Sequence, residues 1–117
     1  MEINQQCVNL DYVEEISGGD SEFKKEMIEI FLKQIPEFTT NLDKYLIECN
    51  YSDLAKEAHT AKSSVLIFKM EDTGALLKTI QLDAERNEID SLSYKIQPVK
   101  FDMENASREL SAILKDL

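Results

Sequence analysis

The 117-residue sequence has few of the residues that interrupt regular structure: it contains three glycines and two prolines, and no tryptophan. This scarcity of turn-forming residues suits a protein made of helices. No apolar run approaches the roughly 20 residues that a transmembrane helix needs, and residues 1–12 show neither the basic segment nor the apolar core of a signal peptide. We therefore expect a cytoplasmic protein that does not enter a membrane.

Cysteine and histidine are equally scarce. Cys7 and Cys49 are far apart, no CxxC pair occurs, and the chain has one histidine. A zinc site or a disulfide framework therefore has little support, and we expect two reduced thiols. The sequence also lacks a P-loop, a dinucleotide-binding fingerprint, an HExxH motif and a Ser-His-Asp signature, so it gives no sign of an intrinsic cofactor or of the enzymes that these motifs identify.

The chain has few positively charged residues: it contains 13 lysines and arginines and 23 acidic residues, which gives a net charge of −10. Nucleic acids and anionic membranes bind basic surfaces, so neither is expected as a partner, and a protein or a small cation is favoured. A composition of 43% hydrophobic and 31% charged residues is typical of a soluble globular domain with one modest core. We expect residues 1–117 to form a single domain and a monomer.

Apolar residues recur at spacings of three and four along almost the whole chain, which is the period of amphipathic helices. A short helix is expected over residues 9–16, ending at Gly18-Gly19. Pro36 should bend the next helix without breaking it, and Pro98 should either kink the last helix or mark its start. The first three of the four longer helices are expected to begin at the following caps: Asp20 or Ser21, Asn50 or Ser52, and Asp72. The apolar repeat of the last helix begins at Leu92.

Four long amphipathic helices joined by short connections bury their apolar stripes most simply as an antiparallel bundle. The sequence therefore predicts an all-α fold: an antiparallel four-helix bundle with a short additional N-terminal helix. The residues expected to face its core are Leu10, Val13 and Ile16; Phe23, Met27, Ile30, Phe31, Phe38, Leu42, Tyr45 and Leu46; Leu54, Ala58, Ala61, Val65 and Phe68; Leu76, Leu77, Ile80 and Ala84; and Leu92, Ile96, Val99, Met103, Ala106, Leu110, Ile113 and Leu117.

One of these helices contains the only histidine, His59. At about 100° per residue, His59 lies well over 90° around the helix from the core stripe, so its imidazole should reach the surface. Residues three and four apart are neighbours on a helix, which places Ala55 one turn before His59, Lys62 and Ser63 one turn after it, and Leu66 two turns after it. Small neighbours leave the imidazole accessible to a phosphorus atom held by another protein.

These residue types suit phosphoryl transfer. A neutral imidazole has one ring nitrogen with a free lone pair, which can act as a nucleophile toward phosphorus. Lys62 can place an ammonium beside the phosphoryl oxygens, and Ser63 and Ser64 can add hydroxyl donors. Taken singly, each is an ordinary surface or helix-flank residue. Only their position on the same side of one helix supports a functional role.

The run Ala58-His59-Thr60-Ala61-Lys62-Ser63-Ser64 resembles the A-H-x-L-K-G-S signature of histidine-containing phosphotransfer (HPt) domains, and the resemblance extends from about Leu10 to the C-terminus. It implies that His59 is phosphorylated in mid-helix, that Lys62 contacts the phosphoryl group, and that the position of Ser63 must stay small. Two departures matter. Ser63 stands where glycine is commoner, and Phe68-Lys69-Met70 replaces Leu-Gly-Ala, which indicates a different turn or an extra basic group at Lys69.

The resemblance implies a phosphorelay carrier. His59 would accept a phosphoryl group from the aspartate of a response-regulator receiver domain, free or within a hybrid histidine kinase, and pass it to another receiver. The receiver would supply Mg²⁺, and the chain would not be a kinase by itself. Ala55, Leu66 and Lys69 are expected to contact the receiver.

The alternative is a non-phosphorylated helical adaptor in which His59 is incidental. A fragment of an ATP-driven histidine kinase is a third interpretation, but the sequence has no nucleotide-binding motif.

Overall fold

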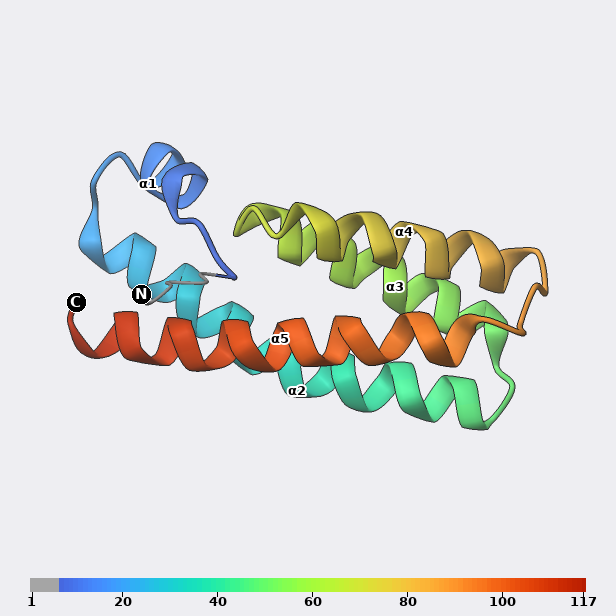
Figure 1. The fold of residues 1–117 in the computed structure, drawn as a ribbon. Coiled ribbons are helices and arrows are strands. Elements are labelled where there is room, and N and C mark those ends of the chain that lie inside the picture. The colour runs from blue at the N-terminus through green and yellow to red at the C-terminus, as the bar shows by residue number, and fades with distance from the viewer. Residues whose placement is uncertain (1–6) are drawn as a thin grey trace, which may run out of the picture.

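The computed structural model describes residues 7–117, and in this range the chain forms helices and no strands (Figure 1). The predicted all-α class is therefore confirmed. The helices are α1 (Asp11–Ser17), α2 (Ser21–Ile47), α3 (Tyr51–Ile67), α4 (Glu71–Glu85) and α5 (Leu92–Lys115). None of these helices is both long and apolar enough to cross a bilayer.

Helix caps explain where α2 and α3 begin. The carboxylate of Asp20 accepts hydrogen bonds from the backbone N–H groups of Glu22 and Phe23, and the side chain of Asn50 accepts one from Asp53. Each cap satisfies N–H groups that have no partner within the first turn of a helix. The predicted starts at Asp20 and Asn50 are therefore confirmed.

The predicted start of α4 is wrong. Asp72 lies inside the first turn, and Met70 holds the capping position without a side-chain hydrogen bond. Met70 is buried in the core, and its carbonyl accepts from the N–H of Gly74, so burial of the methionine starts the helix two residues early. Glu71 and Asp72 instead place negative charge near the positive end of the helix dipole.

Both prolines lie inside helices. α2 continues through Pro36, and α5 starts at Leu92 and continues through Pro98, so Pro98 does not mark the start of the last helix. Each proline removes one backbone hydrogen bond. Buried residues on both sides, such as Ile96 and Val99 around Pro98, hold each helix together by packing.

The core is built mainly from the predicted stripes, with clear exceptions in α2. Phe23 and Ile30 are exposed, whereas Ile28 and Ile35 are buried. The buried α2 residues follow one unbroken spacing of three and four, and Ile30 lies about 200° around the helix from Ile28. Two residues outside α2, Ile16 and Leu117, were also expected inside and are exposed. The buried α2 residues are Ile28, Phe31, Ile35, Phe38 and Leu42.

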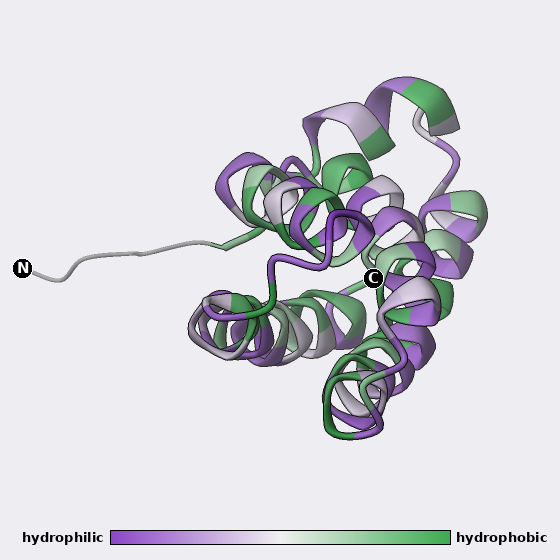
Figure 2. Ribbon diagram, turned by 90° about the vertical axis from the view of Figure 1, so that its right-hand side faces the viewer, coloured by the Kyte–Doolittle hydropathy of each residue, from purple (hydrophilic) through white to green (hydrophobic). Residues whose placement is uncertain are grey.

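The helices α2 to α5 lie lengthwise beside one another (Figure 1), and α3 packs against both α2 and α4, as α5 does. Hydrophobic and hydrophilic residues alternate around the turns of each helix (Figure 2), as one-sided burial requires. The Phe31 and Phe68 rings stack across the core with centroids 4.7 Å apart.

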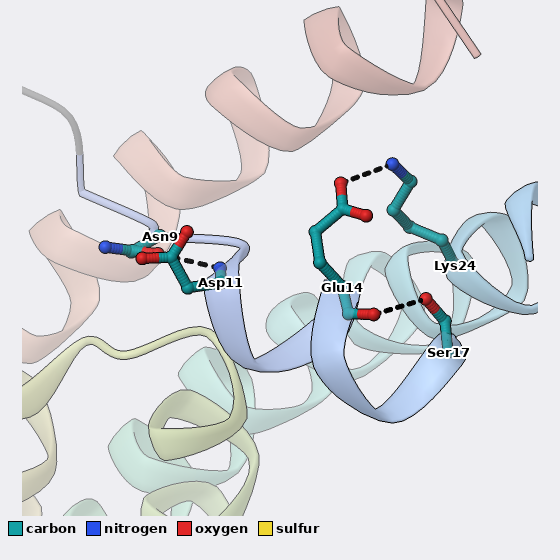
Figure 3. A network of polar contacts seen from close by, with 5 residues as sticks. All are labelled: Asn9, Asp11, Glu14, Ser17 and Lys24. Atoms are coloured by element: carbon teal, nitrogen blue, oxygen red, sulfur yellow. Dashed lines mark hydrogen bonds and ion pairs between the residues drawn. The ribbon is translucent and has the colours of Figure 1, made fainter. Parts of the chain in front are cut away.

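The short helix α1 is fastened by polar contacts (Figure 3). Lys24 of α2 forms an ion pair with Glu14 at 2.6 Å. Within α1 itself, the hydroxyl of Ser17 donates to the carbonyl of Glu14 at 3.1 Å. The N–H of Asn9 donates to the carbonyl of Phe68 at 2.9 Å. Gly18 then adopts a left-handed conformation with φ 60°, which ends the helix as expected.

Candidate functional site

His59 lies near the middle of α3, and its side chain is exposed. The preceding residue Ala58 and the next core residue, Ala61, are fully buried. The core face of α3 is the predicted one, from Leu54 to Phe68. His59 therefore projects from the flank of α3 beside α4, where another molecule can reach its ring.

The imidazole of His59 is held by a residue of α4. Its Nδ1 lies 3.3 Å from Oε1 of Gln81, and Nε2 of Gln81 donates to a carboxylate oxygen of Glu85 at 3.0 Å. A carboxylate oxygen accepts hydrogen bonds, so Glu85 fixes which end of the Gln81 amide is the NH₂ group. The other end, a carbonyl oxygen, can only accept, and Nδ1 of His59 must then be the donor.

This contact selects one tautomer of the ring. With the proton on Nδ1, the lone pair of the neutral imidazole lies on Nε2, the nitrogen that makes no hydrogen bond among the described residues. A carbonyl that holds the far nitrogen of an imidazole also stabilises positive charge as it develops on the ring. The His59 flank therefore presents an oriented nucleophile at the surface.

A groove runs beside His59 between α3 and the C-terminal half of α4. At one end of the groove, the hydrogen bond with the Cys49 thiol raises the pKa of the Tyr51 phenol above its ordinary value. Ala55, expected to contact a partner, is only 5% exposed and forms part of the floor of the groove. The groove is lined by Tyr51, Ser52, Ala55, Lys56, His59, Thr60, Gln81, Ala84, Glu85 and Asn87.

The residues that follow His59 along α3 take different positions. Lys62 is half-buried and Ser63 is exposed. The hydroxyl of Ser63 lies 3.4 Å from the carbonyl of His59 and donates to it, so this hydroxyl is engaged within its own helix. Ser64 lines a separate hollow beside Phe31 and Phe68, so it does not join the His59 flank.

Leu66 marks the far end of this flank. It is 42% exposed and lies over Gly74 of α4, where an added Cβ would stand 2.7 Å from Cδ2 of Leu66. A side chain at position 74 would therefore require the end of the Leu66 side chain to shift.

Lys69 is exposed in the turn between α3 and α4 and has φ 58°, the left-handed conformation that glycine adopts most easily. The turn therefore keeps a glycine-like backbone although it has a lysine. Lys69 lines a different hollow, with Met70, Thr73 and Asp102, so it is not brought into the groove of His59.

Gln81 and Glu85 are the site residues that sequence reasoning missed. Both lie on the side of α4 that faces α3, four residues apart, and Gln81 directly follows the buried residue Ile80. A polar pair at this spacing on a helix is common. Only the pairing of α3 with α4, which the sequence does not give directly, connects them to His59.

Comparison of the chain with protein-family models, with characterised proteins and with solved structures gave no match. An exposed imidazole with one nitrogen tied to an amide oxygen can accept an electrophilic group on the other nitrogen.

Proposed function

We propose that this protein is a phosphorelay carrier of the HPt kind, and that α2 to α5 form its antiparallel four-helix bundle with α1 as the additional N-terminal helix. His59 accepts a phosphoryl group from the aspartate of one receiver domain and passes it to another. The observation that carries the proposal is the exposed His59 ring whose Nδ1 faces the amide oxygen of Gln81.

The transfer step follows from this tautomer. The lone pair of Nε2 attacks the phosphorus atom, a P–N bond forms, and the P–O bond to the aspartate breaks, so that the aspartate leaves as a carboxylate. No proton has to leave Nδ1 during the attack. The positive charge that develops on the ring is stabilised by Oε1 of Gln81, which Glu85 orients from behind.

The neighbours of His59 support the approach of a second protein. Ser63 is small, and Ala55 lies at the level of the groove floor, so neither blocks attack along the line of the breaking bond. Lys62, three residues after His59, supplies an ammonium that can offset the charge of the phosphoryl oxygens. Leu66 offers an apolar contact for the receiver two turns farther along.

The carrier depends on its partner for the rest of the chemistry. Phosphoryl transfer is driven by positioning and by stabilisation of charge, and the receiver brings Mg²⁺ and its own acidic pocket. We accordingly propose receiver domains, free or within a hybrid histidine kinase, as partners in the cytoplasm, and no kinase activity of the chain alone. Incubation with ATP should leave the isolated protein unlabelled.

Uptake of phosphate separates this function from that of an adaptor. The purified chain and its His59→Ala variant are mixed with a receiver carrying a labelled phosphoryl group, and the label on each is measured. A carrier loses uptake in His59→Ala, while Thr40→Ala, an exposed substitution on α2 away from the groove, keeps it. An adaptor takes up no label in any of the three proteins, and its partner binding survives the loss of His59.

A further inference from the structure

The contacts between α3 and α4 fix which residues lie opposite one another. His59 meets Gln81, and Leu66 meets Gly74. From His59 to Leu66 the chain advances seven residues along α3, and from Gln81 to Gly74 it goes back seven residues along α4. The two helices therefore run antiparallel with a fixed register. On this register Lys62, three residues after His59, lies level with Lys78, three residues before Gln81.

Lys78 lies on the flank of α4 that borders His59. It is one turn from Gln81 and one turn from Gly74, the two residues that face α3, and neighbours at these spacings share one side of a helix. Its side chain is exposed, whereas Leu77 beside it is fully buried. A lysine side chain at this place can extend across the seam toward the ring of His59.

Neither lysine is engaged elsewhere. Within residues 7–117, no carboxylate lies within 4.0 Å of the ammonium of Lys62 or Lys78, while Lys24, Lys95 and Lys100 each have an acidic partner. An ammonium without a fixed partner keeps its charge available for an incoming anion.

The surrounding segments contain no acid. Residues 58–70 and 73–82 have neither aspartate nor glutamate, although the chain has 23 acidic residues among its 117. Four acids flank these segments. Glu57 accepts a hydrogen bond from Asn41 of α2, Asp83 pairs with Lys95 of α5, and Glu71 and Asp72 lie in the first turn of α4, on the far side of Gly74 from Lys78. The part of the seam between His59 and Leu66 is therefore a cationic area on an acidic protein.

We propose that Lys78 is a second cation of the His59 site, and that its ammonium binds the oxygens of the phosphoryl group on Nε2 from the side opposite Lys62. The proposal rests on the function proposed above. Two cations from two helices hold the group more firmly than one, and they also offset the charge that spreads over its oxygens during transfer. Lys78 would then contact the transferring group directly.

Two donors test this role. The full chain and the variants Lys78→Gln, Lys78→Arg and Lys33→Gln are phosphorylated by a receiver and, separately, by phosphoramidate, a small donor that needs no protein contact. Lys33 is an exposed lysine of α2 and serves as the matched control. Lys78→Gln should lower the initial rate of His59 phosphorylation about threefold to tenfold with both donors, as expected for the loss of one nearby charge. Lys78→Arg and Lys33→Gln should stay within about twofold of the native rate.

Three results would overturn the proposal: an unchanged rate in Lys78→Gln with both donors, an equal loss in Lys33→Gln, or a loss with the receiver alone. The last would make Lys78 a docking residue instead of a phosphoryl ligand. The two donors also separate this proposal from the proposed function. If no receiver phosphorylates the native chain, the carrier function fails, and the phosphoramidate rates still decide whether Lys78 acts on the phosphoryl group.

Discussion

Oε1 of Gln81 lies 3.3 Å from Nδ1 of His59, and this contact joins α4 to the middle of α3. It sets the proton of the ring on the nitrogen nearer the protein and leaves Nε2 for chemistry. Because Glu85 holds the other end of the amide, the orientation of Gln81 follows from the donor and acceptor roles of three side chains.

Removal of the Gln81 amide should slow phosphoryl uptake. One hydrogen bond contributes about 0.5–1.5 kcal/mol, so Gln81→Ala should lower the initial rate of His59 phosphorylation about threefold to tenfold. The same change at Gln97, an exposed glutamine of α5, should have no effect. The NMR signals of the ring nitrogens should also show a loss of the preference for the Nδ1–H tautomer in Gln81→Ala. Equal rates and an unchanged tautomer would remove Gln81 from the mechanism.

The Phe31–Phe68 stack should dominate the stability of the core. Both rings are almost fully buried, so Phe31→Ala should lower the free energy of unfolding by about 3–5 kcal/mol. Phe101 is 62% exposed on α5, and Phe101→Ala should cost less than about 0.5 kcal/mol. Unfolding in urea, followed by circular dichroism, measures both. Similar losses in the two variants would contradict the described core.

Gly74 should resist a side chain only while Leu66 is present. Alanine favours a helix over glycine by about 1 kcal/mol, but its Cβ at position 74 meets Leu66 at 2.7 Å. We expect Gly74→Ala to raise the free energy of unfolding of the Leu66→Ala variant by about 1 kcal/mol. In the native protein, the same substitution should raise it by a smaller amount. A double-mutant cycle of unfolding free energies measures the difference. Equal gains in both backgrounds would contradict the contact between Leu66 and position 74.

The two cysteines should differ in reactivity. Burial, and then the charge of Glu109, raises the pKa of the Cys7 thiol from 9.0 to about 11. The raised pKa keeps this thiol protonated at pH 8, where its thiolate fraction is about 100-fold lower than that of an unshifted thiol. Cys49 is exposed. Iodoacetamide at pH 8 should therefore modify Cys49 at least about tenfold faster than Cys7.

Mass spectrometry of the alkylated peptides gives both rates. The difference should shrink in the Glu109→Gln variant and vanish in denaturant, because the cause lies in the folded environment of Cys7. Cys7 that reacts as fast as Cys49 in the native protein would contradict its contact with Glu109.

The sequence predicted those features that depend on local pattern. The caps at Asp20 and Asn50 are correct because an N-cap needs only its own turn, and the exposure of His59 follows from the phase of α3. Phe23 and Ile30 are exposed, contrary to the prediction, because they lie outside the strict spacing of three and four that the buried residues of α2 follow. Met70 replaced Asp72 as the cap of α4 because burial outweighed a local hydrogen bond.

The missing part of the candidate site depends on contacts between helices. Gln81 and His59 are 22 residues apart, and their contact depends on the register of α3 against α4. That register is fixed by the close approach at Gly74 and by the left-handed backbone of Lys69 in the turn. A lysine in this conformation has no clear sequence signature, so the partner of His59 was not predictable from the pattern of α4.

The most direct test of the account is to identify the atom that carries the phosphoryl group. The native chain is phosphorylated by a labelled receiver, isolated, and examined by ³¹P and ¹⁵N NMR before a second receiver is added. The account predicts label on Nε2 of His59, stable in alkali and lost in acid, which then moves to the second receiver. Label on Nδ1 or on another residue, or no label on the native chain, would contradict it.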